Sequence, residues 1–328
     1  MSCVRQQLTS IGVSPSSAEI IMASWRKGTK TQYQTYITKW SQFCVATKCE
    51  FFNPSITTII QFLTNLFHSG LSYSAINSAR SALSAICQTN NHTIPFGQHP
   101  LVKRFMKGIF ELRPTFPRYN SIWDVNIVFN YLRKQPPIHE LTLKDLTIRL
   151  TFLLLILSGK RGQTIHLLNL TDMDLSESKC VFSIREKIKT TRLGHHIAPI
   201  TYEAYPHEPE LCIVRHLKEY IERTNELRSS NCKKLLISFI KPHQAVSRNT
   251  ISRWCKTLNA AGIDTKEFGS HSTRAASASF AATQVGDKTK IVESIGWSNA
   301  TTFQTFYNKP IKKTFNLGST ILRQNEIS

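Results

Sequence analysis

The sequence lacks any hydrophobic run long enough to cross a membrane. Its longest apolar stretch, around residues 153–157, lies between Arg149 and Lys160 and falls far short of the about 20 residues that a spanning helix needs. The N-terminus also lacks the basic and then apolar pattern of a secretory signal peptide. We therefore expect no membrane span and an intracellular location.

Metal-binding cysteine patterns are missing as well. The chain has eight cysteines, but they include no CxxC pair and no Cys/His cluster at zinc-finger spacing. Scattered cysteines of this kind are typical of reduced thiols in an intracellular protein. The sequence thus predicts no metal centre.

Acidic residues are scarce. The chain of 328 residues has 21 Asp and Glu against 41 Lys and Arg, a formal net charge of +20, and its pI is near 9.8. A positive field of this strength attracts polyanions, of which nucleic acid is the commonest and an acidic membrane surface the second. The hydrophobic content of 41% suits a globular protein, and the length is sufficient for two domains.

The first third of the chain is predicted to be helical. Apolar residues recur at helical spacing over residues 31–44, 55–70 and 72–86, and a fourth helix is expected after Pro100. Four helices with short connections form an all-α unit, and two prolines between flanking arginines at 113–118 mark its end. We predict a helical domain over residues 1–113, a linker over 114–118 and a second domain over 119–328.

The second domain combines helices with a small sheet. Two short β-type segments flank a polar, basic turn region, whereas the other apolar patterns have helical spacing. The expected strands are 180–184 and 196–200, and the expected helices are 124–133, 143–158, 212–223, 248–261, 272–282 and 291–307, the last interrupted near Gly296. The sequence therefore predicts a mainly α fold with a small antiparallel sheet, an α+β class.

Two basic motifs could hold a phosphate. Arg161 follows a strongly apolar helix between Gly159 and Gly162, where the chain can turn tightly and present a planar guanidinium. His271 and Arg274 are three residues apart, so both point into one site if Ser270 caps a helix. Each motif alone has a simpler explanation: a basic helix C-cap for the first and a solvated helix start for the second.

A third motif lies near the C-terminus. Gly296 and Trp297 precede a segment with Phe303, Phe306 and Tyr307. On its own, this pattern is typical of an aromatic stripe packed into a core.

The order of these motifs resembles that of the tyrosine recombinase (phage integrase) family. The order is a helix followed by Gly-x-Arg, a basic β-turn, HxxR, and Gly-Trp with a tyrosine ten residues later, all in a basic protein. The resemblance extends over most of the chain, because Gly12-Val-Ser-Pro, Trp25-Arg and the four-helix region are similar to recombinases of DIRS and Crypton mobile elements. It implies an N-terminal helical core-binding domain and a C-terminal catalytic domain.

The resemblance also implies roles for single residues. Arg161 and Arg274 would bind the phosphate, Tyr307 would be the nucleophile, and His271 and Trp297 would assist. The family's lysine lies on the β-hairpin turn, where Lys189 matches its position better than Lys187 does. Two features depart from the family pattern: Thr164 stands where an acidic residue is common, and one extra residue separates Trp297 from Tyr307, which makes Phe306 the competitor in register.

The chemistry and partners follow from the same resemblance. The enzyme would cut one strand of double-stranded DNA through a 3′-phosphotyrosyl link and reseal it without ATP, metal or other cofactor. It would act as a homotetramer on two DNA sites, in the nucleus if the host is eukaryotic. The tail 309–328 would be exchanged between subunits or packed on its own subunit. The residues predicted to contact DNA are Lys30, Arg80, Lys103, Arg104, Lys107, Lys187 and Arg192.

Three other functions are compatible with the sequence. A type IB topoisomerase shares the chemistry but does not exchange partners, and a recombinase-derived DNA-binding protein shares the fold without activity. A basic structural protein with accidental motif matches would have the six predicted catalytic residues far apart in space.

Overall fold

The computed structural model describes residues 2–87, 94–188, 191, 198–285, 287–297 and 299–312. The chain divides into two compact units, Met1–Pro117 and Arg118–Ser328. The boundary between them falls within residues 114–118, the predicted linker.

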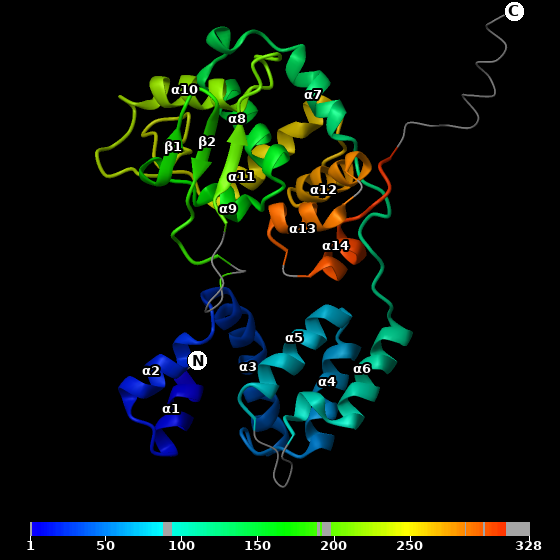
Figure 1. The fold of residues 1–328 in the computed structure, drawn as a ribbon. Helices are drawn as coiled ribbons and strands as arrows, with labels where there is room; N and C mark the ends of the chain where they lie inside the picture. Colours follow the sequence, from blue (N-terminus) through cyan, green and yellow to red (C-terminus); the bar gives the residue numbers. More distant parts are fainter. Residues whose placement is uncertain are drawn as a thin grey trace, which may run out of the picture. The chain divides into compact units, whose positions relative to one another are not determined.

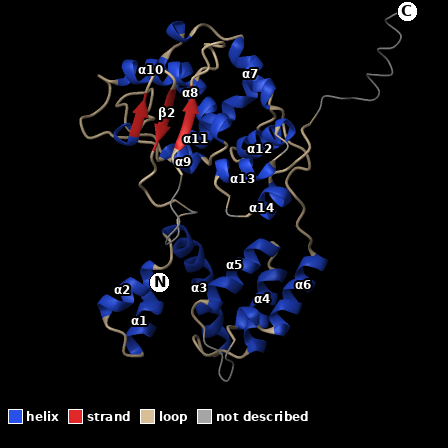
Figure 2. Ribbon diagram, in the orientation of Figure 1, coloured by secondary structure: helices blue, strands red, loops and turns tan. Residues whose placement is uncertain are grey.

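Unit 1 is built of helices alone in its described part (Figure 2). Its helices are α1 (Ser2–Ser10), α2 (Pro15–Ala23), α3 (Lys27–Thr47), α4 (Ile56–His68), α5 (Tyr73–Ser84) and α6 (Pro100–Leu112), with a 3-10 turn at Phe96–Gln98. The prediction of four helices was wrong, because α1 and α2 precede them. These two helices bury only Val4, and Ala18 with Met22, respectively, so their apolar pattern is too short to stand out.

The predicted helix starts of unit 1 are explained by their caps. The hydroxyl of Ser55 accepts a hydrogen bond from the Thr58 amide, and that of Ser72 accepts one from the Ala75 amide, which satisfies free amides of the first turn. The helices pack around Trp40, which is fully buried and donates its indole N–H to the Phe51 carbonyl at 2.9 Å.

Unit 2 is mainly helical with one three-stranded antiparallel sheet. Its elements are α7 (Val125–Arg133), α8 (Leu143–Ser158), α9 (Gly162–His166), β1 (Met173–Leu175), β2 (Lys179–Phe182), β3 (Ile200–Glu203), α10 (Ile213–Thr224), α11 (Arg248–Trp254), α12 (Ser272–Gln284), α13 (Lys288–Ile295) and α14 (Ala300–Phe306), with 3-10 turns at Ile138–Glu140, Leu170–Asp172 and Cys255–Ala261. The strand order is β1-β2-β3, and Phe182 is paired with both Met173 and Ile200. The predicted α+β class is confirmed.

Several details of this unit differ from the prediction, and one of them is the short helix α9, which was not predicted. The second predicted strand, 196–200, is displaced: residues 196 and 197 lie outside the described residues, 198 and 199 are not in a strand, and β3 runs over Ile200–Glu203. Burial alternates along β3, with the side chains of Ile200 and Tyr202 inside. The alternating pattern of this strand therefore starts at residue 200, where the predicted strand ended. The strand β1 was missed because it has only three residues, and the helix predicted over 248–261 changes to a 3-10 turn after Trp254.

Helix α8 is the central element of unit 2. Ten of its sixteen residues are buried, and it contacts α10, α12 and β3, as Figure 1 shows. Its apolar run is therefore a buried core helix, and in the described part of the chain no helix is both long and apolar enough to cross a membrane. All eight cysteines lie in described residues and are free thiols.

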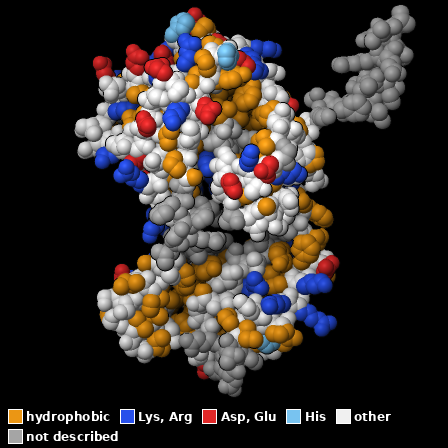
Figure 3. All heavy atoms as spheres, viewed as in Figure 1, with side chains coloured by type: hydrophobic (Ala, Val, Ile, Leu, Met, Phe, Trp, Pro, Cys, Tyr) orange, Lys and Arg blue, Asp and Glu red, His pale blue; other side chains and the backbone are white. Residues whose placement is uncertain are grey.

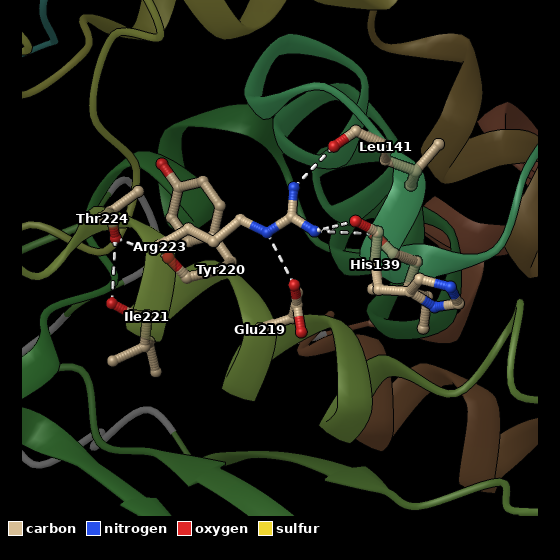
Figure 4. Close-up of polar contacts among 8 residues, drawn as sticks. His139, Leu141, Glu219, Tyr220, Ile221, Arg223 and Thr224 are labelled. Atoms are coloured by element: carbon tan, nitrogen blue, oxygen red, sulfur yellow. Dashed lines mark hydrogen bonds and ion pairs between the residues drawn. The ribbon is translucent and has the colours of Figure 1, made fainter.

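An arginine of α10 fixes the loop that leads into α8. Arg223 donates hydrogen bonds to the carbonyls of Ile138, His139 and Leu141 and pairs with Glu219 one turn earlier (Figure 4). These carbonyls belong to the 3-10 turn at Ile138–Glu140 and to Leu141, which follows it. The guanidinium thus joins α10 to the start of α8, the helix that delivers Arg161 to the site.

Candidate active site

The end of α8 forms a turn that contacts two other helices. Gly159 adopts the left-handed conformation (φ 58°) and its amide donates to the Leu155 carbonyl at 3.0 Å, which ends the helix. A Cβ at this position would lie 3.0 Å from Ile295 Cδ1 of α13, so glycine is required here for packing as well as for conformation. Arg161 follows two residues later, as the residue that precedes α9.

Arg274 lies on the first turn of α12 and is almost completely buried. Its side chain is 3% exposed, and Nη1 donates to the Gly159 carbonyl at 2.9 Å. The expected cap at Ser270 is wrong: α12 starts at Ser272, and His271 is the residue that precedes it, without a side-chain cap bond. Arg274 is nevertheless brought directly to the turn that carries Arg161.

Trp297 and Tyr307 lie against the Arg274 guanidinium. The Arg274 Cζ atom is 4.4 Å from the Trp297 ring centroid and 5.5 Å from the Tyr307 ring centroid. The two rings are 4.7 Å apart with an interplanar angle of 42°. Phe306 is 63% exposed, so the structure brings Tyr307 to the arginine and leaves its competitor in register outside.

The backbone around Tyr307 is held by α12. Ser279, which is 2% exposed, donates its hydroxyl to the Tyr307 carbonyl at 2.6 Å and accepts from the Lys309 amide at 3.0 Å. Further along, the Ile122 amide donates to the Pro310 carbonyl. The chain that follows the tyrosine is therefore attached to unit 2 at two points.

The site concentrates positive charge and free donors. Burial, and next the charge of Arg161, lower the pKa of Arg274 to about 10, while the nearby Tyr307 phenol opposes this shift. None of the ion pairs among the described residues involves Arg161 or Arg274. Within the same residues, Arg274 Nε and Nη2 and the Trp297 indole N–H are buried without a hydrogen-bond acceptor. Buried donors in this number suit an oxyanion.

His271 and Arg161 line a common pocket of about 320 Å³. The pocket also includes Arg248 and Asn249 from the start of α11, and Ser252 and Ser270. Sequence reasoning missed Arg248, although Ser247 caps α11 through the Thr250 amide and thereby places a basic residue on its first turn.

Five of the six predicted catalytic residues therefore fall into one neighbourhood. Arg274, Trp297 and Tyr307 are in mutual contact, Arg161 acts electrostatically on Arg274, and His271 shares the pocket of Arg161. Lys189 and Arg192 lie outside the described residues. Lys187 is described and exposed.

A second phenol lies close to the site. Burial raises the pKa of Tyr119, and the neighbouring Tyr307 phenol raises it further. Tyr119 packs against Phe268, with ring centroids 5.4 Å apart. Its surroundings therefore disfavour the phenolate that a nucleophile requires.

The predicted DNA-contacting residues of unit 1 differ in exposure. Lys103, Arg104 and Lys107 are exposed on α6, where Figure 3 shows basic side chains gathered, and Lys30 is half-buried. Arg80 is also half-buried and donates to the Gly97 carbonyl at 3.0 Å. This bond gives the Arg80 guanidinium a role inside unit 1, in holding the turn before α6.

The part of the chain that the structure describes contains no group of three or more His, Cys, Asp or Glu arranged to hold a metal ion. The groups that the site does offer are its arginines, aromatic rings and histidine.

Known proteins resemble this chain in structure and not detectably in sequence. No protein-family model matches it, and no curated protein does. The Tn1549 transposon integrase in complex with transposon right-end DNA has a TM-score of 0.59 and 12% identity over 99% of this chain and 98% of that chain. The XerH site-specific recombinase bound to difH substrate in a post-cleavage complex has a TM-score of 0.58 and 16% identity over 90% and 78%.

A lambda integrase dimer bound to a COC′ core site has a TM-score of 0.53 and 16% identity over 91% of this chain and 95% of that chain. The closer resemblance to DIRS and Crypton recombinases stays a prediction. With these similarities added to the element order and the small antiparallel sheet, the chain has the fold of the tyrosine recombinases and integrases.

Proposed function

We propose that this protein is a site-specific DNA recombinase that cuts and rejoins DNA through a covalent link to Tyr307. One observation carries the proposal: the buried Arg274 guanidinium contacts the rings of Trp297 and Tyr307 and lies within electrostatic range of Arg161. Three helices far apart in the sequence, α8, α12 and α14, combine to make this arrangement. Accidental motif matches would not converge in this way.

The arginines supply the phosphate site. A phosphodiester gains negative charge on its non-bridging oxygens as a nucleophile attacks, and fixed guanidinium donors stabilise that gain. Among the described residues, Arg274 Nε and Nη2 and the Trp297 indole N–H are donors of this site that are buried without a protein acceptor.

Tyr307 is the better of the two phenols at the site for nucleophilic attack. A tyrosine has a pKa of about 10 in water and needs nearby positive charge and a proton acceptor to react at neutral pH. Arg274 and Arg161 supply the charge, and His271 would accept the proton. Tyr119 lies where burial disfavours its phenolate.

The reaction balances without an external energy source. The Tyr307 oxygen forms a bond to phosphorus while the bond to the 5′-oxygen breaks, and that oxygen takes up a proton, for which Lys189 is the proposed donor. The products are a 3′-phosphotyrosyl link and a free 5′-hydroxyl. A 5′-hydroxyl from a second strand then attacks the link and releases the tyrosine.

Double-stranded DNA is the proposed partner, and four copies on two sites the proposed assembly. The net charge of +20 favours a polyanion, and the similar lambda integrase has been solved as a tetramer bound to a Holliday junction, with a TM-score of 0.51. The exposed basic residues of α6 would contact phosphates and fix position rather than sequence. A protein of this function would act where the DNA is, in the nucleus of a eukaryotic host.

A suicide-substrate assay tests the proposal. Wild type, Tyr307→Phe and the matched control Tyr119→Phe are each incubated in EDTA with nicked DNA from the flanks of the protein's own coding element. Wild type and the control should give a covalent protein–DNA band on a denaturing gel, and Tyr307→Phe should give none. DNA binding without a band in any protein would indicate a non-catalytic DNA-binding protein, and relaxation of supercoils by a monomer would indicate a topoisomerase.

A further inference from the structure

Lys160 lies between two residues of the site but has no part in the chemistry proposed above. It is 8% exposed, and its Nζ donates to the Ser294 carbonyl at 2.7 Å. A buried ammonium costs free energy unless it is well paired, and none of the ion pairs in the described part of the chain involves Lys160. Its position therefore needs an explanation.

The C-terminus of α13 provides that explanation. Gly296 is left-handed (φ 81°), and its amide donates to the Val292 and Glu293 carbonyls, as the Trp297 amide does to Val292. These bonds satisfy carbonyls that the end of the helix leaves free. Lys160 satisfies the next one, at Ser294, and it brings a positive charge to the negative end of the helix dipole.

Packing at the same point brings α13 close to the turn after α8. Ile295 lies so close to Gly159 that a Cβ there would approach within 3.0 Å. A Cβ at Gly296 would lie 3.5 Å from Lys160 Nζ, so a side chain there would sit directly against the ammonium. The residues before Trp297 are thus held against the turn at 159–161. This turn contains Arg161, and its Gly159 carbonyl accepts the hydrogen bond from Arg274.

The segment that contains α13, Trp297, α14 and Tyr307 depends on such links. Ala278, Ile291, Val292, Ile295, Trp297 and Phe303 form a small core of their own, separate from the main core of unit 2, and Figure 1 shows α13 and α14 beside α12. A small core contributes little to holding its segment in place. Ser279 and Ile122 fix the chain after Tyr307, and Lys160 fixes it before Trp297.

We propose that Lys160 is a positioning residue for the nucleophile: its bond to the Ser294 carbonyl holds the end of α13 on the turn at 159–161, and so holds Trp297 and Tyr307 against Arg274. The inference rests on the proposed function for its catalytic consequence, but not for its structural one. The low pKa of Lys160, about 8, which burial and next the charge of Arg274 bring about, is the electrostatic cost of this arrangement.

The first test is hydrogen–deuterium exchange on the free protein. Lys160→Met keeps the apolar stem and removes the ammonium, and Lys290→Met, an exposed lysine of α13, is the matched control for charge. The amides of residues 295–307 should exchange about tenfold faster in Lys160→Met than in wild type, with α8 and α10 unchanged and the control like wild type. Unchanged exchange over 295–307 would overturn the inference, whatever the protein does to DNA.

The second test separates positioning from binding and from proton donation. On the nicked substrate, Lys160→Met should form the covalent complex about tenfold or more slowly than wild type, while its Kd for DNA stays within about twofold of that of Lys290→Met. A substrate with sulfur at the 5′ bridging position needs no proton donor for its leaving group, and it should not restore the rate. If that substrate restores the rate of Lys160→Met, or if Lys160→Met forms the complex as fast as wild type on the ordinary substrate, the positioning role is contradicted. If wild type itself forms no covalent complex, the proposed function is refuted instead.

Discussion

At the scale of single residues, Arg274 is the contact point of the site. Its guanidinium is shared among the turn after α8, the indole of Trp297 and the phenol of Tyr307. A planar fork with five N–H donors can serve these partners and still offer free donors to a phosphate. A lysine at this position has the charge but not the geometry.

Ser279 offers a test of how tightly the nucleophile is held. Ser279→Ala removes the donor to the Tyr307 carbonyl and the acceptor of the Lys309 amide, so we expect about tenfold slower covalent-complex formation in single-turnover assays. Ser277→Ala is the control, because the Ser277 hydroxyl donates to the Thr273 carbonyl of its own helix. Equal rates for the two variants would show that the Ser279 hydrogen bonds do not affect the rate of covalent-complex formation.

Lys160 should change how the unfolding free energy depends on pH. Its folded pKa is about 8 against about 10.4 for an unfolded lysine, so between these values the unfolded state binds a proton that the folded state does not, and stability rises with pH. Urea unfolding should give a difference in unfolding free energy, wild type minus Lys160→Met, that rises by up to about 3 kcal/mol from pH 7 to pH 10.5. Arg274, with a pKa near 10, titrates at the upper end of this range in both proteins, so its contribution cancels in the difference.

Groups that titrate elsewhere, such as the buried Tyr202, cancel in this difference because both proteins contain them. A difference that is constant over the pH range would mean that Lys160 is not desolvated in the folded protein.

At the scale of elements, helices with strong local signals were predictable from the sequence. Helix α8 runs from Leu143 to Ser158 as predicted, because Thr142 caps its start and Gly159 ends it. The bounds of β3 were not predictable, since the alternation of Ile200 and Tyr202 is only four residues long and its register depends on pairing with β2.

The candidate site was predictable in its residue types but not in its supports. Arg161, Arg274 and Tyr307 belong to motifs with recognisable spacing, whereas Lys160, Ser279 and Arg248 act through contacts between elements far apart in sequence. A buried lysine beside an expected phosphate-binding arginine looks like any other basic residue of a helix C-cap. Its role becomes visible only when Ser294, 134 residues away, is brought next to it.

Arg223 tests how the start of α8 is held. Arg223→Met removes the side-chain donor of three carbonyls of the loop at 138–141, of which that of Ile138 keeps a backbone donor, the Leu141 amide, and we expect a loss of about 2–3 kcal/mol in the unfolding free energy of unit 2. Glu219→Gln, which weakens only the i,i+4 ion pair, should cost no more than about 0.5 kcal/mol. Thermal or urea unfolding measures both, and similar losses for the two variants would contradict the importance of the carbonyl bonds.

At the scale of the whole molecule, charge should govern DNA affinity. The exposed Lys103, Arg104 and Lys107 share one helix, and replacing all three with Gln should weaken binding equally for target and unrelated DNA. The slope of log K against log salt concentration should become shallower by about 0.9 for each DNA phosphate that the variant no longer neutralises. An unchanged slope would exclude α6 from the DNA-binding surface.

Peptide mapping of the DNA adduct tests whether Tyr307 becomes covalently joined to DNA. The covalent complex formed by wild type on nicked DNA is digested with nuclease and protease and analysed by mass spectrometry. We expect a nucleotide attached through its 3′-phosphate to the peptide that contains Tyr307. A nucleotide on Tyr119 or on any other residue would contradict it.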